Sequence, residues 1–393
     1  MDKAGVGWMV LVLGIMVFWA NGDNYVAAPL IVEVARDFHL EISAAAQAIT
    51  AYMLPFGLFT LLFGPLADKY GKARVINLAA WGTAIFCALC AWASDLTSLS
   101  VMRALSGAFA SGILPVTMSL IGDSFGQDPK EMQNALGKVL GMMFLGGASG
   151  TAIGGALAYL GSWRMVYLVY GLAGLVIALI MWRTIEQRPG TSAGVGFRAA
   201  YEEALANTRL LKTVSIIFLN GFAVFGSFSY TGKFVELRTG HNILWVGLIL
   251  TCFGLATVLG GRKAGSWRQK YGNRLLLWSG TLAGVAWGAM GAWTSPLLIC
   301  LSLGGLGLGF IIIQSTLLAT AQQLMPQRRG TVMSLASFNM FVGGGLGTLV
   351  NGQILNWVGF PAVFLLAAAL ILLAGILAMV CLSKVSLIPV KMS

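Results

Sequence analysis

The sequence has 393 residues, of which 58% are hydrophobic and 10% are charged, whereas about 25% of the residues of an ordinary soluble domain are charged. These values exclude a soluble globular protein. The formal net charge of +11 suggests nucleic-acid binding, but the basic residues fall in the short segments between apolar runs, as they do in membrane proteins. We therefore expect a lipid bilayer, and no nucleic acid, as the partner.

Twelve apolar runs divide the chain, and each is long enough to cross a hydrocarbon core that needs about 20 residues. They cover roughly 7–32, 43–67, 74–94, 98–122, 132–159, 163–183, 213–235, 243–263, 274–294, 297–322, 330–356 and 360–383. An even number of spans places both termini on one face. Twenty of the 25 lysines and arginines lie on that face, and four lie on the other. This excess predicts an all-α integral membrane protein of the inner (cytoplasmic) membrane, with both termini cytoplasmic.

Charged side chains within a span are costly and mark functional sites, and two of them stand out in this sequence. Asp23 lies roughly 22 Å from the cytoplasmic end of the first span, and Arg103 lies roughly 7 Å from the outer end of the fourth. Both fall in the outer third of the membrane, so we expect them to pair. Burial disfavours a charged carboxyl group and the arginine favours it, so a small rearrangement changes its proton affinity. We predict proton coupling by this pair; the alternative is a structural ion pair that holds two helices together.

A charged turn joins the second and third spans, with the sequence Gly64-Pro65-Leu66-Ala67-Asp68-Lys69-Tyr70-Gly71-Lys72-Ala73-Arg74. Its glycines permit a close helix approach and a bend with φ > 0. The alternation of glycine, one acid and several bases strongly resembles the signature loop between helices 2 and 3 of the major facilitator superfamily of secondary transporters. The resemblance implies a gating role for the loop, carried by Gly64, Asp68, Gly71, Lys72 and Arg74.

Asp123, at the cytoplasmic end of the fourth span, is predicted to act with Asp68 in this gate. Near both acids, the span that begins after Pro326 offers unpaired N–H groups and a positive helix end. Closing the cytoplasmic face is expected to bring the acids and that helix end together. The alternative is that both acids are solvated beside lysines.

The two halves of the chain repeat. A shift of 201 residues places Lys69-Tyr70-Gly71 on Lys270-Tyr271-Gly272, and a shift of 197 residues places Gly146-Gly147 on Gly343-Gly344. Parallel six-helix repeats that rock about a midplane site are typical of transporters. We predict two pseudo-symmetric six-helix bundles, an N-terminal one at 1–188 and a C-terminal one at 212–393, joined by a cytoplasmic linker with an amphipathic helix at 189–211.

Further patterns narrow the resemblance to the twelve-helix drug:proton antiporter branch of the superfamily, in which related exporters often place an acid at the position of Asp23. Arg103 with Gly107 is similar to that family's RxxxG pattern, in which the arginine serves proton coupling. The segment 150–155, Gly-Thr-Ala-Ile-Gly-Gly, and the following 163–167, Trp-Arg-Met-Val-Tyr, look like its GPxxGG motif and WRxxF follow-on, with threonine in place of the proline. The resemblance implies an antiporter motif made of Gly146, Gly150, Gly154 and Gly155.

The second half offers few charges to a binding site, because Glu236, in an outer loop, is its only acid after Glu203. We therefore expect neutral and aromatic side chains to line a mostly apolar cavity. The candidates are Tyr52, Asn220, Tyr230, Gln314 and Asn339, each of which is also a plausible helix-packing residue. Lys233, at the outer end of the seventh span, is expected to favour anionic or zwitterionic substrates.

The remaining chemistry of the sequence is sparse. Cys87 and Cys90 form a CxxC pair inside a span, where we interpret them as small buried apolar residues. No metal-ligand spacing, nucleophile–histidine pair or phosphate-binding loop appears in the sequence. We expect no enzyme activity, no metal and no cofactor, with the proton gradient as the driving force.

These features predict a secondary active transporter that exports small amphipathic or hydrophobic, drug-like molecules by proton antiport with alternating access. One alternative is a carrier, exporter or facilitator, for one defined metabolite such as a sugar, amino acid or other organic solute. Another is a non-transporting membrane receptor or enzyme. We expect a monomer that binds a small-molecule substrate and protons.

Overall fold

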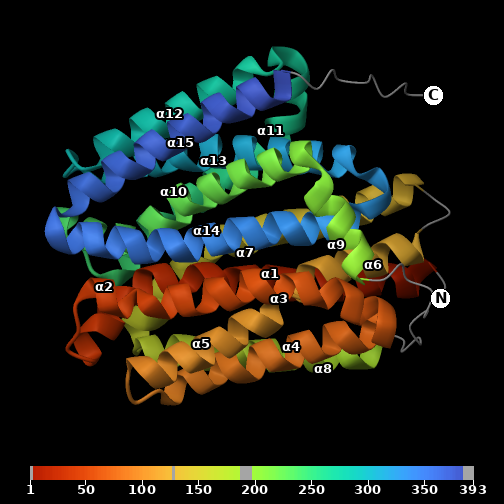
Figure 1. The fold of residues 1–393 in the computed structure, drawn as a ribbon. Coiled ribbons are helices and arrows are strands. Elements are labelled where there is room, and N and C mark those ends of the chain that lie inside the picture. Colours follow the sequence, from red (N-terminus) through yellow and green to blue (C-terminus); the bar gives the residue numbers. More distant parts are fainter. Residues whose placement is uncertain (1–2, 126–128, 186–196, 384–393) are drawn as a thin grey trace.

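The computed structural model describes residues 3–125, 129–185 and 197–383, and the regular elements in this part of the chain are helices (Figure 1). They are α1 (Lys3–Asp37), α2 (Ile42–Ala45), α3 (Gln47–Tyr70), α4 (Lys72–Leu89), η1 (Cys90–Trp92), α5 (Leu96–Ala110), α6 (Ile113–Ser124), α7 (Pro129–Leu160), α8 (Trp163–Thr184), α9 (Phe197–Ala206), α10 (Thr208–Thr239), α11 (Ile243–Tyr271), α12 (Arg274–Met290), α13 (Pro296–Leu324), η2 (Pro326–Arg328), α14 (Arg329–Trp357) and α15 (Phe360–Ser383).

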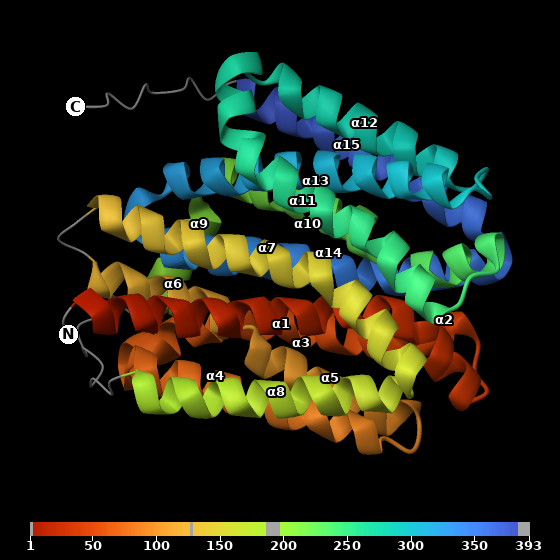
Figure 2. The same ribbon diagram turned by 180° about the vertical axis from the view of Figure 1, so that it is seen from behind.

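Eleven helical segments of the described chain are long and apolar enough to cross a membrane, against the twelve predicted. The remaining predicted span is α12, whose 17 residues stand at the short end of the range of about 17–25 that crosses a bilayer. It packs against α13 and α15, beside the other long helices of the second half (Figures 1 and 2). The twelve-helix layout is therefore present, with one helix shorter than expected.

The helices of the two halves pack in the same pattern. In the first half, α1 packs against α7 and α8, and α4 packs against α5 and α8. In the second half, α10 packs against α14 and α15, and α12 packs against α13 and α15. The pairs α3–α5 and α11–α13 also correspond. This matched pairing is the internal repeat of the sequence expressed in three dimensions.

The halves meet along three helix pairs, α1–α10, α7–α11 and α3–α14. Figure 1 shows the first half (red to yellow-green) below the second (green to blue), with α1 beginning and α15 ending at the same side. We call that side the terminal face and the other side the opposite face. The long helices run between these faces, so each residue's place along its helix gives its depth.

The repeated turn of the sequence has the same backbone role in both halves. Gly71 separates α3 from α4 with φ 96°, and Gly272 follows α11 with φ 60°. Both values lie where glycine is favoured because it has no Cβ atom. In each copy, the lysine before the tyrosine places its Nζ atom about 5 Å over the tyrosine ring, at 5.1 Å for Lys69 and 5.2 Å for Lys270.

The predicted fourth span is broken between α5 and α6. Pro115 has no backbone N–H, so it donates no helical hydrogen bond to the carbonyl group of Ser111. The Thr60 hydroxyl of α3 donates to that carbonyl oxygen instead, at 3.1 Å. The break thus keeps its backbone paired inside an apolar environment and shapes the wall of a cavity described below.

Candidate functional site

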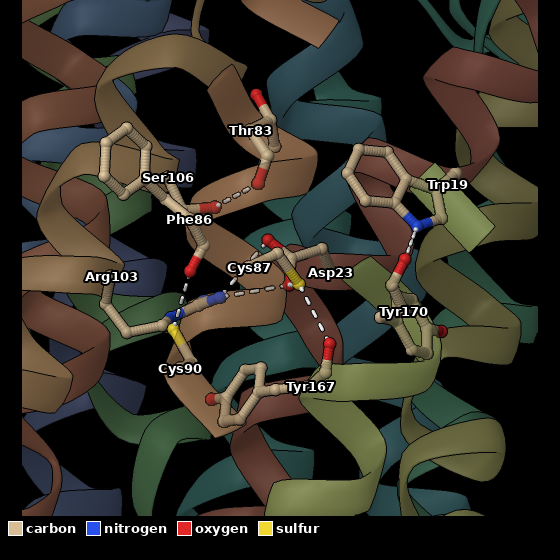
Figure 3. Close-up of polar contacts among 10 residues, drawn as sticks. All are labelled: Trp19, Asp23, Thr83, Phe86, Cys87, Cys90, Arg103, Ser106, Tyr167 and Tyr170. Atoms are coloured by element: carbon tan, nitrogen blue, oxygen red, sulfur yellow. Dashed lines mark hydrogen bonds and ion pairs between the residues drawn. The ribbon is translucent and has the colours of Figure 1, made fainter. Parts of the chain in front are cut away.

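The described spans hold a buried ion pair between α1 and α5 (Figure 3). Nη1 of Arg103 donates to both carboxylate oxygens of Asp23, at 3.0 Å and 3.2 Å. The exposed fractions of the two side chains are 1% and 0%. The contact expected from helix depths is therefore present, and it lies wholly inside the first half.

Gly107 explains how the arginine reaches this place. It lies one turn after Arg103 on the same face of α5, and a Cβ atom there would collide with the backbone carbonyl of Tyr52 on α3. Without it, α5 and α3 approach closely and the guanidinium carbon of Arg103 lies 4.2 Å from the centroid of the Tyr52 ring. The Tyr167 ring lies at 5.3 Å. Aromatic faces stabilise the cation in addition to the carboxylate.

Cys87 is a partner that the sequence interpretation missed. It is buried as expected, but its Sγ atom lies 3.3 Å from Oδ1 of Asp23 and donates to it (Figure 3). The same sulfur lies 3.7 Å from the carbonyl oxygen of Tyr167. A thiol inside an apolar span carries no sequence pattern that reveals which carboxylate it faces. Asp23 thus receives hydrogen bonds from α4 as well as α5.

Three of the four motif glycines of α7 pack against α1. A Cβ atom on Gly150 would lie 2.7 Å from the carbonyl oxygen of Gly22, and atoms added to Gly146 and Gly154 would collide with Phe18 and Val26. The spacing of four residues puts the three glycines on one face of the helix. This stripe holds α7 directly behind the turn of α1 that carries Asp23.

A central cavity of about 410 Å³ lies between the halves, on the other side of α1 from the ion pair. Helices of both halves line it, with mostly apolar side chains. On α1 the lining includes Asn21, Asn24 and Tyr25, whereas Asp23 points to α5 because successive residues of a helix differ by about 100° in direction. On α13 and α14 the lining reaches Gln322 and Met333, near the terminal face.

Aromatic rings close the cavity toward the opposite face. Phe56 of α3 and Phe341 of α14 contact each other across the halves, with ring centroids 3.9 Å apart and planes tilted by 32°. Phe225 of α10 lies 6.1 Å from Phe341 and 5.5 Å from Phe310. Tyr25 of α1 reaches across to Phe225 at 6.1 Å. The cavity therefore extends toward the terminal face and ends at an aromatic layer near the middle of the bundle.

Comparison with known proteins identifies the family of this chain. The model of the Major Facilitator Superfamily matches residues 13–348, which is most of the chain. The chain belongs to this superfamily. It is similar to the uncharacterised MFS-type transporters YceJ and YwfA of Bacillus subtilis, with 24% identity over 345 residues (86% of each chain) and 26% identity over 389 residues (94% of this chain and 90% of the other). It is also 25% identical over 264 residues to the inner membrane transport protein YnfM of Escherichia coli, covering 63% of this chain and 60% of that one.

A solved structure with the same fold is that of a bacterial homolog of the human lysosomal transporter Spinster, in an inward-facing and unoccupied conformation. It superposes with a TM-score of 0.74 at 18% identity and covers 98% of this chain and 96% of that one. The predicted fold is thus confirmed. The chain is a multi-pass membrane transporter and not an enzyme, and transporters of this superfamily generally need no cofactor.

The transporter's predicted cavity residues lie in different places. Gln314 lines the cavity, and Asn220 lies behind it, donating to Gln314 Oε1 at 3.2 Å. Tyr52 is buried under Arg103. Tyr230 donates to the carbonyl oxygen of Thr348 at 2.7 Å, beyond the aromatic layer, and Asn339 donates to Leu335 of its own helix at 2.8 Å. Asn220, Tyr52 and Tyr230 thus contact neighbouring helices, the alternative that the sequence left open, whereas Asn339 is bonded within α14.

Asn21 and Asn24 were missed as cavity residues, although a pattern for them exists. They stand three residues apart on α1, about 60° from each other around the helix, and neither shares the direction of Asp23. Two amides on one face of a membrane helix indicate a polar stripe. The aromatic residues of the lining carry no such pattern, because phenylalanines occur on every face of these helices.

The opposite face is closed by ion pairs between α1 and α10. Glu236 accepts hydrogen bonds from Arg36 of α1 and from Lys233 at 2.8 Å, and Arg36 also donates to Glu33 at 2.9 Å. Lys233 lines a separate pocket of about 510 Å³ at this face and not the central cavity. Its cation is therefore paired within α10, beside the Arg36–Glu236 contact that joins the halves and away from the central cavity.

Trp163 and Arg164 clamp the same face within the first half. Trp163 Nε1 donates to Oδ2 of Asp37 at 3.2 Å, Arg164 pairs with the same oxygen, and Arg164 Nη2 donates to the carbonyl oxygen of Ala93 at 3.0 Å. The start of α8 is thereby tied to the end of α1 and to the turn before α5. The WRxxF-like segment is structural in this arrangement.

At the terminal face, Lys72 of α4 pairs with Asp123 of α6 at 2.6 Å. Arg74 is exposed, and a Cβ atom on Gly64 would meet nothing within 4 Å, so no close helix approach occurs there. The side chain of Asp68 lies outside the described part of the chain. The predicted latch of Asp68 and Asp123 against the start of α14 therefore stays a prediction.

The short helix α9, within the range predicted for the linker, connects both halves at this face. Ala204 packs with Leu210 and Val332 of the second half, and Glu203 pairs with Arg328 at 3.1 Å. The Tyr201 hydroxyl donates to the carbonyl oxygen of Leu61 on α3 at 3.1 Å. The Tyr201 side chain of α9 thus reaches the first half.

Proposed function

We propose that this transporter exports small amphipathic or hydrophobic molecules in exchange for protons, by alternating access. The observation that carries the proposal is the position of α1. One side of this helix holds Asp23 against Arg103, and the next two residues, Asn24 and Tyr25, line the central cavity. A change in the ion pair therefore acts on a helix that forms the substrate site.

Asp23 is the member of the pair that exchanges a proton, because an arginine stays charged at all physiological pH values. When Asp23 takes up a proton, a buried guanidinium loses its counter-charge, and a buried charge without a partner is strongly unfavourable. A movement of α1 relative to α5 that lets water reach Arg103 relieves this cost. The proton and the substrate then compete through the conformation of α1.

Contacts on α3 offer a second link between the pair and the cavity. Tyr52 stacks under Arg103, and its ring lies 5.9 Å from that of Phe56 one turn further on. Phe56 lines the cavity and its ring contacts that of Phe341 of the second half. Loss of the Arg103–Tyr52 contact would shift a ring that helps to close the two halves.

The proposed direction of transport depends on how the chain is oriented in the membrane. The excess of lysine and arginine on the side of the termini supports a cytoplasmic terminal face, and the cavity reaches toward that face. The bundles predicted at 1–188 and 212–393 would rock about the aromatic layer, with the linker at 189–211 on the cytoplasmic side. The relative YnfM, named as an inner membrane protein, supports this membrane.

The test is proton flux in inverted membrane vesicles, followed with a pH-sensitive dye while cationic, neutral and anionic compounds are added. Antiport predicts that a transported compound releases protons from wild-type vesicles and not from Asp23→Asn vesicles. Asp37→Asn is the matched control, since Asp37 is an acid of the same helix that also pairs with an arginine, Arg164. Retained coupling in Asp23→Asn would remove Asp23 from the mechanism, and equilibration of one solute across the membrane without proton movement would favour a facilitator for a single metabolite.

A further inference from the structure

We infer that the central cavity accepts an uncharged aromatic molecule that donates a hydrogen bond to Asn24, in preference to a permanently charged one. This inference deepens the proposed function, because it takes the cavity to be the substrate site. It depends on three features of the lining: its charge, its aromatic content and one buried acceptor.

The lining has no counter-charge to offer a substrate ion. None of the described residues that line the cavity is Asp, Glu, Lys, Arg or His. The carboxylate of Asp23 faces away from the cavity and is neutralised by Arg103, and Lys233 is held by Glu236 at the opposite face. Moving an ion from water into such surroundings carries a large desolvation cost with no compensating partner. A neutral molecule avoids this cost.

The walls favour flat apolar groups. Six aromatic side chains contributed by both halves line the cavity: Tyr25, Phe56, Phe144, Phe225, Phe310 and Phe341. Aromatic rings prefer offset-stacked or edge-to-face neighbours, and such contacts add to the gain from burying their surface. The cavity volume of about 410 Å³ is in the range of about 300–1,000 Å³ that is usual for small-molecule sites.

Asn24 supplies the polar contact. Its side chain is 8% exposed, and its Oδ1 atom is buried without a hydrogen-bond partner among the described residues. The other lining amides each make a contact: Asn21 Nδ2 donates to the carbonyl oxygen of Met143 at 2.7 Å, Gln314 contacts Asn220 and the Met340 sulfur, each at 3.2 Å, and Gln322 Nε2 donates to the Met333 sulfur at 2.7 Å. A buried acceptor without a donor is unfavourable. Asn24 lines the cavity, so a turn of its amide would present Oδ1 to an N–H or O–H group of a ligand, which would satisfy it.

The experiment uses four naphthalene probes that differ only in the attached group. N-methyl-1-naphthamide is neutral with an N–H donor, and methyl 1-naphthoate is its near-isostere without a donor. 1-Naphthylacetate is the anion, and (1-naphthylmethyl)trimethylammonium is the cation. Binding to the full-length transporter in lipid nanodiscs is measured by equilibrium dialysis against empty nanodiscs, which corrects for partition into lipid. A Ser315→Trp variant, which fills the cavity wall, gives the background.

Wild-type protein is expected to bind the amide at least about tenfold more tightly than the ester and either ion, about 1.4 kcal/mol at 25 °C. Asn24→Leu should reduce the preference for amide over ester to about threefold or less. Asn339→Leu makes the same change outside the lining and should leave that preference as in wild type. Asn24→Asp should raise the affinity for the cation above that for the amide.

Three results would overturn the inference or part of it. Either ion binding as tightly as the amide would contradict the neutral preference, and so would the absence of binding of all four probes above the Ser315→Trp background. An amide preference that survives Asn24→Leu would overturn the assignment to Asn24. The dialysis experiment in nanodiscs involves no proton gradient, so its result does not depend on antiport. If the amide binds in nanodiscs but causes no proton flux in vesicles, antiport is rejected and the inferred ligand class is kept.

Discussion

Gly155 of α7 and Gly247 of α11 touch backbone to backbone where the two halves meet: a Cβ atom built on either would lie 3.0 Å from the Cα atom of the other. A Cβ atom on Gly155 would also lie 2.7 Å from the carbonyl oxygen of Ile243. One turn away, the hydroxyls of Thr151 and Thr251 lie 3.1 Å apart. Small residues of this kind let membrane helices approach closely. Gly155 is therefore the motif glycine that faces the other half, whereas its three companions face α1.

Gly155→Ala should separate the halves at the opposite face, because the added methyl meets backbone atoms that cannot turn aside. Spin labels are placed at Leu40 and Leu237, both at that face. Double electron–electron resonance is expected to show a larger population of long distances between the two labels. Gly137→Ala, on the same helix where nothing lies within 4 Å, is the control and should leave the distances unchanged. Unaltered distances in Gly155→Ala would show that the contact does not hold the halves together.

Substitutions of Asp23 and Arg103 should have strongly non-additive effects on the stability of the protein. Removing one member leaves the other buried and unpaired, which costs about 3–5 kcal/mol, whereas replacing both with apolar residues is often neutral. Asp23→Leu and Arg103→Met are each expected to lower the unfolding midpoint in detergent more than the double variant does. Additive effects of the two single changes would mean that the pair contributes no coupling energy.

Glu236→Gln should loosen the opposite face, because Glu236 is the acid that joins Arg36 of α1 to Lys233 of α10. Partly exposed ion pairs contribute about 0.2–1 kcal/mol each. The fraction of molecules in which the opposite face is open should therefore rise no more than about fivefold for each pair lost. The measurement is the rate at which an impermeant maleimide labels Ala35→Cys, a buried pocket position, after the three partly exposed native cysteines are replaced by serine. Glu33→Gln, which removes a contact inside α1, should not change this rate.

Tyr201→Phe should release α9 from the first half, since it removes the hydroxyl that donates to Leu61. Backbone amides of 197–206 are expected to exchange hydrogen faster than in wild type, and Tyr271→Phe at the end of α11 should have no such effect. Burial raises the pKa of Tyr201 above its ordinary value of 10.0, so the donor proton is kept until the pH rises through that raised pKa. The difference in amide protection between wild type and Tyr201→Phe should therefore be the same at about pH 6 and about pH 9. If this difference disappears between these pH values, the protection depends on the titration of another group.

The sequence was sufficient for the fold and for the ion pair. Span length and the repeat of Lys69-Tyr70-Gly71 in Lys270-Tyr271-Gly272 predicted the helices and the two halves, because a bilayer imposes a minimum length and a tight turn requires glycine. The rise per residue of a helix is fixed, so the positions of Asp23 and Arg103 along their spans were enough to predict that the two side chains pair. The structure departs from the predicted spans in the short α12 and in the break between α5 and α6, and hydropathy marks neither of them.

The tertiary structure alone decided which polar groups face the substrate cavity. Of the five predicted lining residues, Gln314 lines the cavity, Tyr52, Asn220 and Tyr230 are engaged with neighbouring helices, and Asn339 is engaged with its own helix, while Asn24, Tyr25 and Phe56 line the cavity. The reason is physical: in a membrane protein both lipid-facing and cavity-facing surfaces are apolar, so hydrophobicity does not distinguish them. Only the rotation of each helix against its neighbours, set by contacts such as Gly107 on Tyr52 and Gly155 on Gly247, determines which side chains meet in the centre.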